Sequence, residues 1–395
     1  SSTTICAGYS PMSDHAAYFA ALSAALDRAG IAEAVLVIDR QRLDANIAAV
    51  AATLRGSAGV RLVVKSLPSA PLLHHLSAQL GTSRYMVFNR AMLREMRAID
   101  PAADLLLGKP LPVAAAAAYY GEAGTDGPGP CWLIDSVERL DQYAALARKL
   151  GITLNAAVEV DVGLHRGGVE DPAELSALLD RAGPDIRVRG LMGYDPHLSK
   201  LPTAFGLRAR AYAAMCRHYA AMAGVLRSRG VEPPLLNSAG SPTYALHATG
   251  SPANDLAIGS AFVKPTGFDI DTLAHHQPAC FIATPMLKVG SPARAPGLGT
   301  LPARLLPDRA QAHFIHGGNW QADPVWPAGL RRSAIFGPSS NQECWLGPRA
   351  RDRRPGDWFF LRPRQSEALF LQFGPIAVFD GGEITQAWPV FPASA

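Results

Sequence analysis

Residues 158–169 read Val-Glu-Val-Asp-Val-Gly-Leu-His-Arg-Gly-Gly-Val. The first part alternates as a strand does, and the second part is a turn of glycines and charged groups that contains His165 and Arg166. In an α/β barrel, the loops after the carboxyl ends of the strands carry the chemistry. The segment therefore predicts such a barrel, with both side chains at its functional edge.

A lysine closes a short apolar strand earlier in the chain. Residues 61–65 read Arg-Leu-Val-Val-Lys, after an apolar strand at Val35–Ile38 and an amphipathic helix that opens with Asp44 and Asn46. An amine held where a strand leaves an apolar core is partly desolvated, which makes it nucleophilic toward aldehydes. A lysine at a strand end is more often a solvated terminus, so Lys65 becomes a candidate only in combination with other segments.

Further strand ends carry polar loops. Residues 190–197 read Gly-Leu-Met-Gly-Tyr-Asp-Pro-His, which brings Tyr194 and His197 into a loop after a strand. Residues 237–244 and 255–261 each place Gly-Ser after a short apolar run, where backbone N–H groups and a hydroxyl can hold a phosphate. Gly-Ser turns are common, so neither is informative without the segments described above.

The chain as a whole alternates between apolar strands and helical stretches rich in alanine and leucine. Continuously apolar strands between helices predict a parallel sheet, and eight repeats suit a closed (β/α)8 barrel. The predicted strands are Val35–Ile38, Leu62–Lys65, Tyr85–Phe88, Leu105–Leu107, Trp132–Ile134, Ala157–Val160, Val188–Met192 and Leu235–Asn237.

The pattern changes near Ala274, where prolines and glycines become frequent and helical patterns disappear. Strand-like pieces at 359–361 and 369–373 and a hairpin at 376–384 predict a β-rich domain after the barrel. Met12 is a candidate start, which makes residues 1–11 a candidate extension. We therefore expect an α/β fold with an N-terminal extension and helix over residues 1–32, a (β/α)8 barrel over 33–273 and a C-terminal β-rich domain over 274–395.

Composition argues against several classes of protein. With 48% hydrophobic and only 18% charged residues, the chain can bury a large core. The net charge of +4 is small, and the arginines around residues 349–354 lack aromatic partners or a nucleic-acid motif, so we expect a solvated loop and no nucleic acid. No apolar run reaches the ~18 to 20 residues that span a bilayer, so we expect no membrane partner.

The cysteines and the N-terminus indicate a cellular compartment. Five cysteines are scattered without a metal-binding spacing, which fits a reducing environment. No basic region followed by an apolar stretch opens the chain. We therefore expect a soluble, cytoplasmic protein.

Taken in order, these segments resemble the fold-type III pyridoxal-phosphate enzymes, which have an alanine-racemase-like barrel. Within them the chain is most similar to the D-threonine aldolase and D-serine dehydratase group, from about Ala34 to Phe391. The resemblance implies that Lys65 binds the aldehyde of pyridoxal 5'-phosphate covalently and that Arg166 hydrogen-bonds its phenolic oxygen. It also implies a phosphate site made by Gly240, Ser241, Gly259 and Ser260, with Tyr194 and Asn237 as further cofactor-binding residues.

Some positions depart from the pattern of that group. Its aldolases and dehydratases bind the substrate's β-hydroxyl through a divalent metal, held by a histidine and by a cysteine or aspartate two residues later. Gln365 and Glu367 occupy those positions here. Because glutamine is a poor ligand for zinc or manganese and glutamate can still ligate, the need for a metal is left open. His165 and His197 are then candidate catalytic bases for the β-hydroxyl.

The resemblance implies a function, with alternatives. We expect a pyridoxal-phosphate-dependent carbon–carbon lyase or transaldolase acting on D-β-hydroxy-α-amino acids, with an aldehyde as the other reactant and a homodimer as the assembly. Dehydration, of the D-serine or 3-hydroxyaspartate type, is the alternative. Racemisation is less favoured, because Ala257 stands where racemases place an arginine against the pyridine nitrogen. A non-catalytic pyridoxal-phosphate carrier is disfavoured, because such barrels usually lack a C-terminal β domain.

Overall fold

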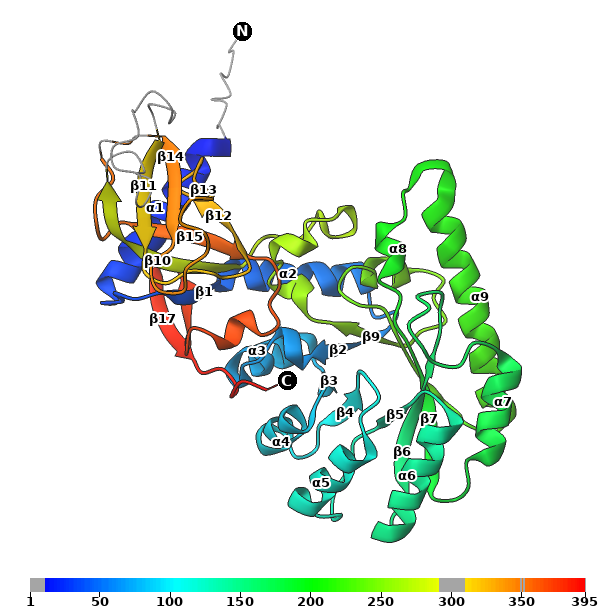
Figure 1. The fold of residues 1–395 in the computed structure, drawn as a ribbon. Coiled ribbons are helices and arrows are strands. Elements are labelled where there is room, and N and C mark those ends of the chain that lie inside the picture. The colour runs from blue at the N-terminus through cyan, green and yellow to red at the C-terminus, as the bar shows by residue number, and fades with distance from the viewer. Residues whose placement is uncertain (1–10, 291–309, 349, 351, 395) are drawn as a thin grey trace. The chain divides into compact units, whose positions relative to one another are not determined.

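The computed structural model describes residues 11–290, 310–348, 350 and 352–394 (Figure 1). These residues form two compact units, and each unit is built from separate parts of the chain. The sheet unit takes its residues from Ser1–Leu43, Pro278–Gln365 and Gln372–Pro389. The barrel unit takes its residues from Asp44–Gln277, Ser366–Leu371 and Val390–Ala395.

The barrel unit contains a parallel sheet of eight strands in the order β4-β3-β2-β9-β8-β7-β6-β5 (Figure 1). A bridge between Leu106 and Cys131 joins the two ends of this order, with Cys131 N donating to Leu105 O over 2.8 Å. The predicted barrel is therefore confirmed. The strands are β2 (Gly59–Val63), β3 (Arg84–Val87), β4 (Asp104–Leu107), β5 (Trp132–Ile134), β6 (Leu154–Val160), β7 (Ile186–Gly193), β8 (Leu235–Ser238) and β9 (Asp255–Ile258).

Helices alternate with most of these strands, and local sequence signals set their ends. The side chain of Ser136 accepts from Arg139 N at the start of α6, and Gly151 ends that helix in the left-handed conformation. Asp171 caps α7 in the same way, with Pro172 in its first turn. The helices are α2 (Arg40–Leu54), α3 (Ala70–Leu80), α4 (Arg90–Ile99), α5 (Val113–Ala123), α6 (Val137–Leu150), α7 (Pro172–Arg181), α8 (His197–Lys200) and α9 (Leu207–Ser228).

The sheet unit is built on a mainly antiparallel sheet whose main path runs β13-β14-β11-β10-β1-β16-β17, with β15 paired to β10 and β12. Helix α1 (Pro11–Arg28) packs on this sheet through Phe19 and Leu22, which contact Phe281 and Phe360 in one buried apolar cluster. The strands are β1 (Val35–Asp39), β10 (Cys280–Gly290), β11 (Ala310–Ile315), β12 (Ala322–Trp326), β13 (Arg331–Arg332), β14 (Cys344–Pro348), β15 (Trp358–Pro363), β16 (Ile376–Asp380) and β17 (Glu383–Trp388).

The first predicted barrel strand is wrong. Val35–Ile38 forms most of β1, which pairs antiparallel with β10 and parallel with β16 in the sheet unit. The barrel takes β9 in its place, a segment recognised from the sequence only as the apolar run before a Gly-Ser turn. The barrel unit accordingly begins at Asp44 inside α2, whereas the sequence placed its start at residue 33.

Other sequence expectations have mixed outcomes. The prediction of a strand at 369–373 is wrong, because Leu369–Leu371 forms a 3-10 turn that belongs to the barrel unit. The hairpin at 376–384 is present as β16 and β17. Arg349, Arg351 and Cys6 lie outside the described residues, and the four described cysteines are free. Among the described helices, none combines the length and apolar character needed to cross a membrane.

Candidate functional site

A cavity opens at the carboxyl ends of the barrel strands, where an α/β barrel carries its functional loops. Its empty volume, counted out to the open side, is about 600 Å³, the size of a small-molecule or cofactor site. We call it the glycine-serine cavity. All of the residues that the sequence singled out for cofactor binding line it: Lys65, Arg166, Tyr194, Asn237, Gly240, Ser241, Gly259 and Ser260.

Lys65 lies in a 3-10 turn, Val64–Ser66, that directly follows β2. Its side chain is half-buried, and Nζ lies 4.5 Å from the centre of the Phe88 ring. Phe88 follows β3, the neighbour of β2 in the barrel, so the two adjacent strands present the amine and the ring to one cavity. An amine in such a place can attack an aldehyde held above the barrel.

The two Gly-Ser turns are tied to each other. Ser241 Oγ accepts hydrogen bonds from Gly259 N at 3.1 Å and from Ala261 N at 3.0 Å, so its own hydroxyl proton remains available to a ligand. A Cβ atom on Gly240 would lie 2.8 Å from the Tyr194 ring, and one on Gly259 would lie 2.8 Å from the Cβ of Ser66. Glycine at both positions keeps the cradle open, as close binding of a phosphate requires.

Arg166 and Tyr194 also line the cavity. Arg166 follows β6, and its guanidinium carbon lies 5.1 Å from the centre of the Tyr194 ring, which follows β7. Its Nη2 lies 3.8 Å from Glu159 Oε1. Burial raises the pKa of Glu159, and the charge of Arg166 opposes that rise. Gly168, at a φ of 99°, lets this loop fold back, since a Cβ there would lie 2.7 Å from Glu159 O.

A buried carboxylate fastens the Tyr194 loop to the first Gly-Ser turn. Asp195 is fully buried and accepts from Thr243 Oγ1 over 2.6 Å. Its other oxygen lies 2.6 Å from His247 Nε2. Because the loop and the turn share this carboxylate, Tyr194 and Ser241 are held in one fixed arrangement.

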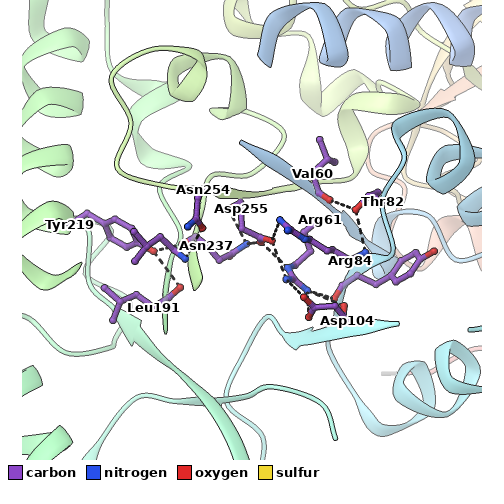
Figure 2. Close-up of polar contacts among 12 residues, drawn as sticks. Val60, Arg61, Thr82, Arg84, Asp104, Leu191, Tyr219, Asn237, Asn254 and Asp255 are labelled. Atoms are coloured by element: carbon purple, nitrogen blue, oxygen red, sulfur yellow. Dashed lines mark hydrogen bonds and ion pairs between the residues drawn. The ribbon is translucent and has the colours of Figure 1, made fainter. Parts of the chain in front are cut away.

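A second buried network of hydrogen bonds and ion pairs holds Asn237 in place (Figure 2). Arg61 bonds Asp255 through two nitrogens, Nε at 2.8 Å and Nη2 at 3.0 Å, and also reaches Asp104. Asp255 Oδ1 in turn accepts from Asn237 Nδ2 over 2.6 Å. Asn237 Oδ1 is buried and has no hydrogen-bond partner among the described residues. Since the amide nitrogen is held by Asp255, this oxygen is the atom that a ligand in the cavity can use.

The two candidate histidines lie elsewhere. Neither is among the described residues that line the glycine-serine cavity. The side chain of His165 is 84% exposed, with Nδ1 3.0 Å from Asp161 Oδ2. His197 begins α8 with its ring against Gly163, and burial lowers its pKa. Their role as catalytic bases stays a prediction, and the structure separates both rings from Lys65 and the Gly-Ser turns.

Glu367 joins the site, and Gln365 does not. Gln365 is exposed and belongs to the sheet unit. Glu367 lines the glycine-serine cavity, and Ser66 Oγ donates to its Oε1 over 2.7 Å. Among the described residues, no group of three or more His, Cys, Asp or Glu side chains is arranged to hold a metal ion. The need for a metal, which the sequence left open, stays untested.

Sequence reasoning missed Phe88 and the contact between Ser66 and Glu367. It also missed a second cavity, which Lys65, Phe88 and Glu367 share with the first. We call it the side cavity. A signal existed for Phe88, because it ends a predicted strand next to the lysine strand. No local signal linked Glu367 to residues some 300 positions earlier in the chain.

The chain was compared with known families and structures. The family model for the alanine racemase N-terminal domain matches residues 38–264, more than half of the chain. The chain belongs to this family. No curated protein sequence matches it.

Solved structures share the fold over nearly the whole chain. D-threonine aldolase from Filomicrobium marinum is 17% identical, with a TM-score of 0.72 over 90% of this chain and 94% of that one. D-threo-3-hydroxyaspartate dehydratase from Delftia sp. HT23 is 18% identical, with a TM-score of 0.72 over 91% and 97%. Alanine racemase from Bacillus anthracis is 14% identical, with a TM-score of 0.67 over 91% and 98%. The recognition of a fold-type III pyridoxal-phosphate enzyme is confirmed.

Pyridoxal phosphate is the cofactor expected for this family, and the residues present fit it. Lys65 would hold its aldehyde carbon, and the two Gly-Ser turns form a narrow cradle for its phosphate. The unpartnered Asn237 Oδ1 and the cationic Arg166 would supply further polar contacts to it.

Proposed function

We propose that this protein is a pyridoxal-phosphate-dependent carbon–carbon lyase that cleaves D-β-hydroxy-α-amino acids to glycine and an aldehyde. One observation carries the proposal. Lys65 and Glu367 line both the glycine-serine cavity and the side cavity, so an amine and a carboxylate are among the residues that the two cavities share.

The division of the site fits the two ends of such a substrate. Pyridoxal phosphate, when bound, draws electrons from the substrate's α-carbon and so weakens the bonds to it. With the cofactor held in the glycine-serine cavity, Lys65 would serve the α-carbon, and the side cavity would take the substituent of the β-carbon. Glu367 then stands on the side of the β-hydroxyl.

Glu367 is the base in this arrangement. Its carboxylate removes the proton of the β-hydroxyl, the C–O bond becomes the C=O of the aldehyde, and the Cα–Cβ bond breaks. The electron pair stays at the α-carbon, which Lys65 protonates to give glycine. Ser66 Oγ, by donating to Oε1 at 2.7 Å, fixes the carboxylate and leaves Oε2 to take the proton.

The D configuration and the β-hydroxyl come from the neighbours in structure. A D-threonine aldolase and a D-threo-3-hydroxyaspartate dehydratase both match this chain over at least 90% of its length. The names of both describe D-configured amino acids with a β-hydroxyl group. Ala257, which lines the cavity, lacks the charge that racemases place there, which counts against racemisation.

Dehydration is the second candidate, because the same two residues could serve it. Lys65 would remove the α-proton, and a protonated Glu367 would release the β-hydroxyl as water. The products differ, since dehydration gives a 2-oxo acid and ammonia, whereas cleavage gives glycine and an aldehyde. A homodimer stays the expected assembly for either reaction.

The test uses the cofactor-loaded protein with a panel of D- and L-β-hydroxy amino acids, with and without EDTA. We expect glycine and aldehyde from the D substrates, at the same rate after chelation. Because a general base contributes ~10² to 10⁴ in rate, Glu367→Gln should lower kcat by that factor. His165→Ala and His197→Ala should change kcat by less than about threefold, as should Glu122→Gln, an exposed carboxylate on α5.

Three outcomes would contradict the proposal. A 2-oxo acid and ammonia as the main products would make dehydration the reaction. Loss of turnover with EDTA and its return with manganese or zinc would make Glu367 a metal ligand rather than the base. A loss of 10²-fold or more in His197→Ala or His165→Ala, with Glu367→Gln unchanged, would assign the base to one of the two histidines that the sequence offered as candidates.

A further inference from the structure

The side cavity has mostly apolar walls and a volume of about 340 Å³, against about 100 Å³ for the glycine-serine cavity by the same measure. An enclosed apolar cavity of ~150 Å³ is large enough to bind benzene, so this one has room for a phenyl-sized group. The walls come from separate parts of the barrel unit: Pro68 after β2, Met92 on α4, Leu371 at the end of the 3-10 turn, and Phe391 near the chain's end.

Hydrogen bonds hold these walls in place. Phe391 N donates to Pro68 O over 2.8 Å, which holds the last described segment, 390–394, against the residues after β2. Asn89 Nδ2 donates to Ser394 Oγ at 3.2 Å, and Asn89 Oδ1 accepts from Met92 N at 2.8 Å. The polar side-chain atoms of Asn89 are therefore hydrogen-bonded within the protein, and the surface toward the cavity stays apolar.

The charged groups of the side cavity do not favour an ionic substituent. Lys109 is exposed at the edge, and Glu95 is half-buried in the same cavity. A carboxylate placed there would meet Glu95 and Glu367 as well as Lys109 and Lys65, so the charges of the cavity balance and leave no surplus cation for it. Burying an ion without a dedicated partner is costly, whereas an apolar group gains by leaving water.

Resting on the proposed function, we propose that the side cavity binds the β-substituent of the substrate and selects a bulky apolar one. The substrates are D-β-hydroxy-α-amino acids with an aryl or branched alkyl group on the β-carbon, and the released product is the matching apolar aldehyde. Lys65 and Glu367, at the junction of the cavities, place the breaking Cα–Cβ bond between them.

The first experiment compares β-substituents. The cofactor-loaded protein is assayed with D-phenylserine, D-threonine, D-serine and D-threo-3-hydroxyaspartate. We expect kcat/KM for D-phenylserine to exceed that for D-threonine by at least tenfold, because the ring fills the apolar cavity. A preference for D-threo-3-hydroxyaspartate that Lys109→Ala removes would overturn the proposal in favour of an acidic substituent.

The second experiment measures binding without turnover. D-Phenylalanine and D-alanine lack the β-hydroxyl, so neither can be cleaved, and their binding is followed by the change in the visible spectrum of the loaded protein. We expect at least tenfold tighter binding of D-phenylalanine. Equal affinities would overturn the proposal. This measurement holds whether the enzyme is a lyase or a dehydratase, so it separates failure of the subsite from failure of the proposed reaction.

Variants that fill the cavity complete the test. Ala91 lines the side cavity on α4, and Ala91→Phe should remove the advantage of D-phenylalanine while D-alanine binds within about threefold of wild type. Ala98→Phe, at an exposed position on the same helix, is the matched control. Leu371→Trp fills the cavity from another wall. If Ala91→Phe does not fold, the binding of D-phenylalanine and D-alanine is compared on this variant instead. Retention of the tenfold advantage in both filled variants would place the substituent elsewhere.

Discussion

Lys65 and Ser66 are consecutive residues in one 3-10 turn, and their side chains act on the same place. Lys65 lines both cavities, and Ser66 Oγ holds the carboxylate of Glu367, which also lines both. A turn directly after a buried strand has little freedom, so the amine and the base are positioned by the same piece of backbone. Catalytic groups supported in this way keep the geometry that proton transfer requires.

The covalent link predicted at Lys65 can be tested chemically. Borohydride reduction of the loaded protein should fix the cofactor on the peptide that contains Lys65, because its amine lies in the glycine-serine cavity. Lys65→Ala should lose the visible absorbance and nearly all activity. A label on Lys109, which lines only the side cavity, or on Lys264, which donates to His276 O over 2.8 Å, would contradict the site.

His276 should make the stability of the barrel unit sensitive to acid. Burial, followed by the nearby His275 and Lys264, lowers the pKa of His276 to about 3. Its Nε2 lies 2.6 Å from Tyr244 OH. The unfolded chain, with an ordinary histidine pKa, binds a proton between pH 6.5 and 3 that the folded state does not bind, so stability falls as the pH drops through this range.

The size of the effect follows from the proton uptake. Proton uptake by one such histidine in the unfolded chain lowers the free energy of unfolding by about 2 kcal/mol between pH 7 and pH 5. Urea unfolding at both pH values, for wild type and His276→Gln, isolates the contribution, since the other acidic groups are common to both proteins. A pH dependence that is the same in the two proteins would refute it.

Strand β2 carries the fully buried Arg61, the cation of the network that supports Asn237. Arg61→Met leaves Asp255 buried without its main partner, which should lower the free energy of unfolding by about 3–5 kcal/mol. Arg84→Met removes another partner of the same carboxylate, at 3.3 Å, but its side chain is 44% exposed, so the loss should be below about 1 kcal/mol. Urea titration of both variants checks the contrast, and equal losses would contradict it.

The strands also show how far the sequence predicts the fold. The other predicted strands overlap barrel strands, because they are largely apolar and each is followed by a polar or glycine-containing turn. β1 has the same composition for another reason: it lies between β10 and β16 and is buried from Leu36 to Asp39. Composition cannot separate a central strand of a mixed sheet from a barrel strand. β9, which starts with the buried Asp255, gave a weaker apolar signal.

That the predicted cofactor-binding residues would line one cavity was predictable for the same structural reason. Each follows or ends a barrel strand, so a motif that marks a strand end also marks the edge of the cavity. The resemblance placed Glu367 near the substrate's β-hydroxyl, as a possible metal ligand and not as the proposed base. The proposed substrate subsite was not predictable, because Leu371 and Phe391 reach the barrel unit from far along the chain. The residues next to these segments in sequence belong to the sheet unit. No periodicity in the sequence marks where the chain goes back to the barrel unit.

Taken as a whole, the molecule has two units that share one chain in alternating pieces. The sheet unit needs β1 from one end and β16 from the other, with Val37 paired to Ala377. The barrel unit needs Ser366–Leu371 and Val390–Ala395 after the sheet strands have been made. Neither unit is a continuous stretch that could be cut out of the chain intact.

This interleaving sets an order on folding during protein synthesis. α1 and β1 are synthesised before the barrel, yet the strands that pair with β1 are made only after it, so their apolar faces stay without native partners while the barrel is translated. Contacts between segments so distant in sequence form slowly, and the exposed surface is one that chaperones bind. The carboxylate of Glu367 and the side-cavity wall at Phe391 are synthesised after both the barrel strands and β15. The nascent chain therefore completes its candidate site only after most strands of the sheet unit have been made.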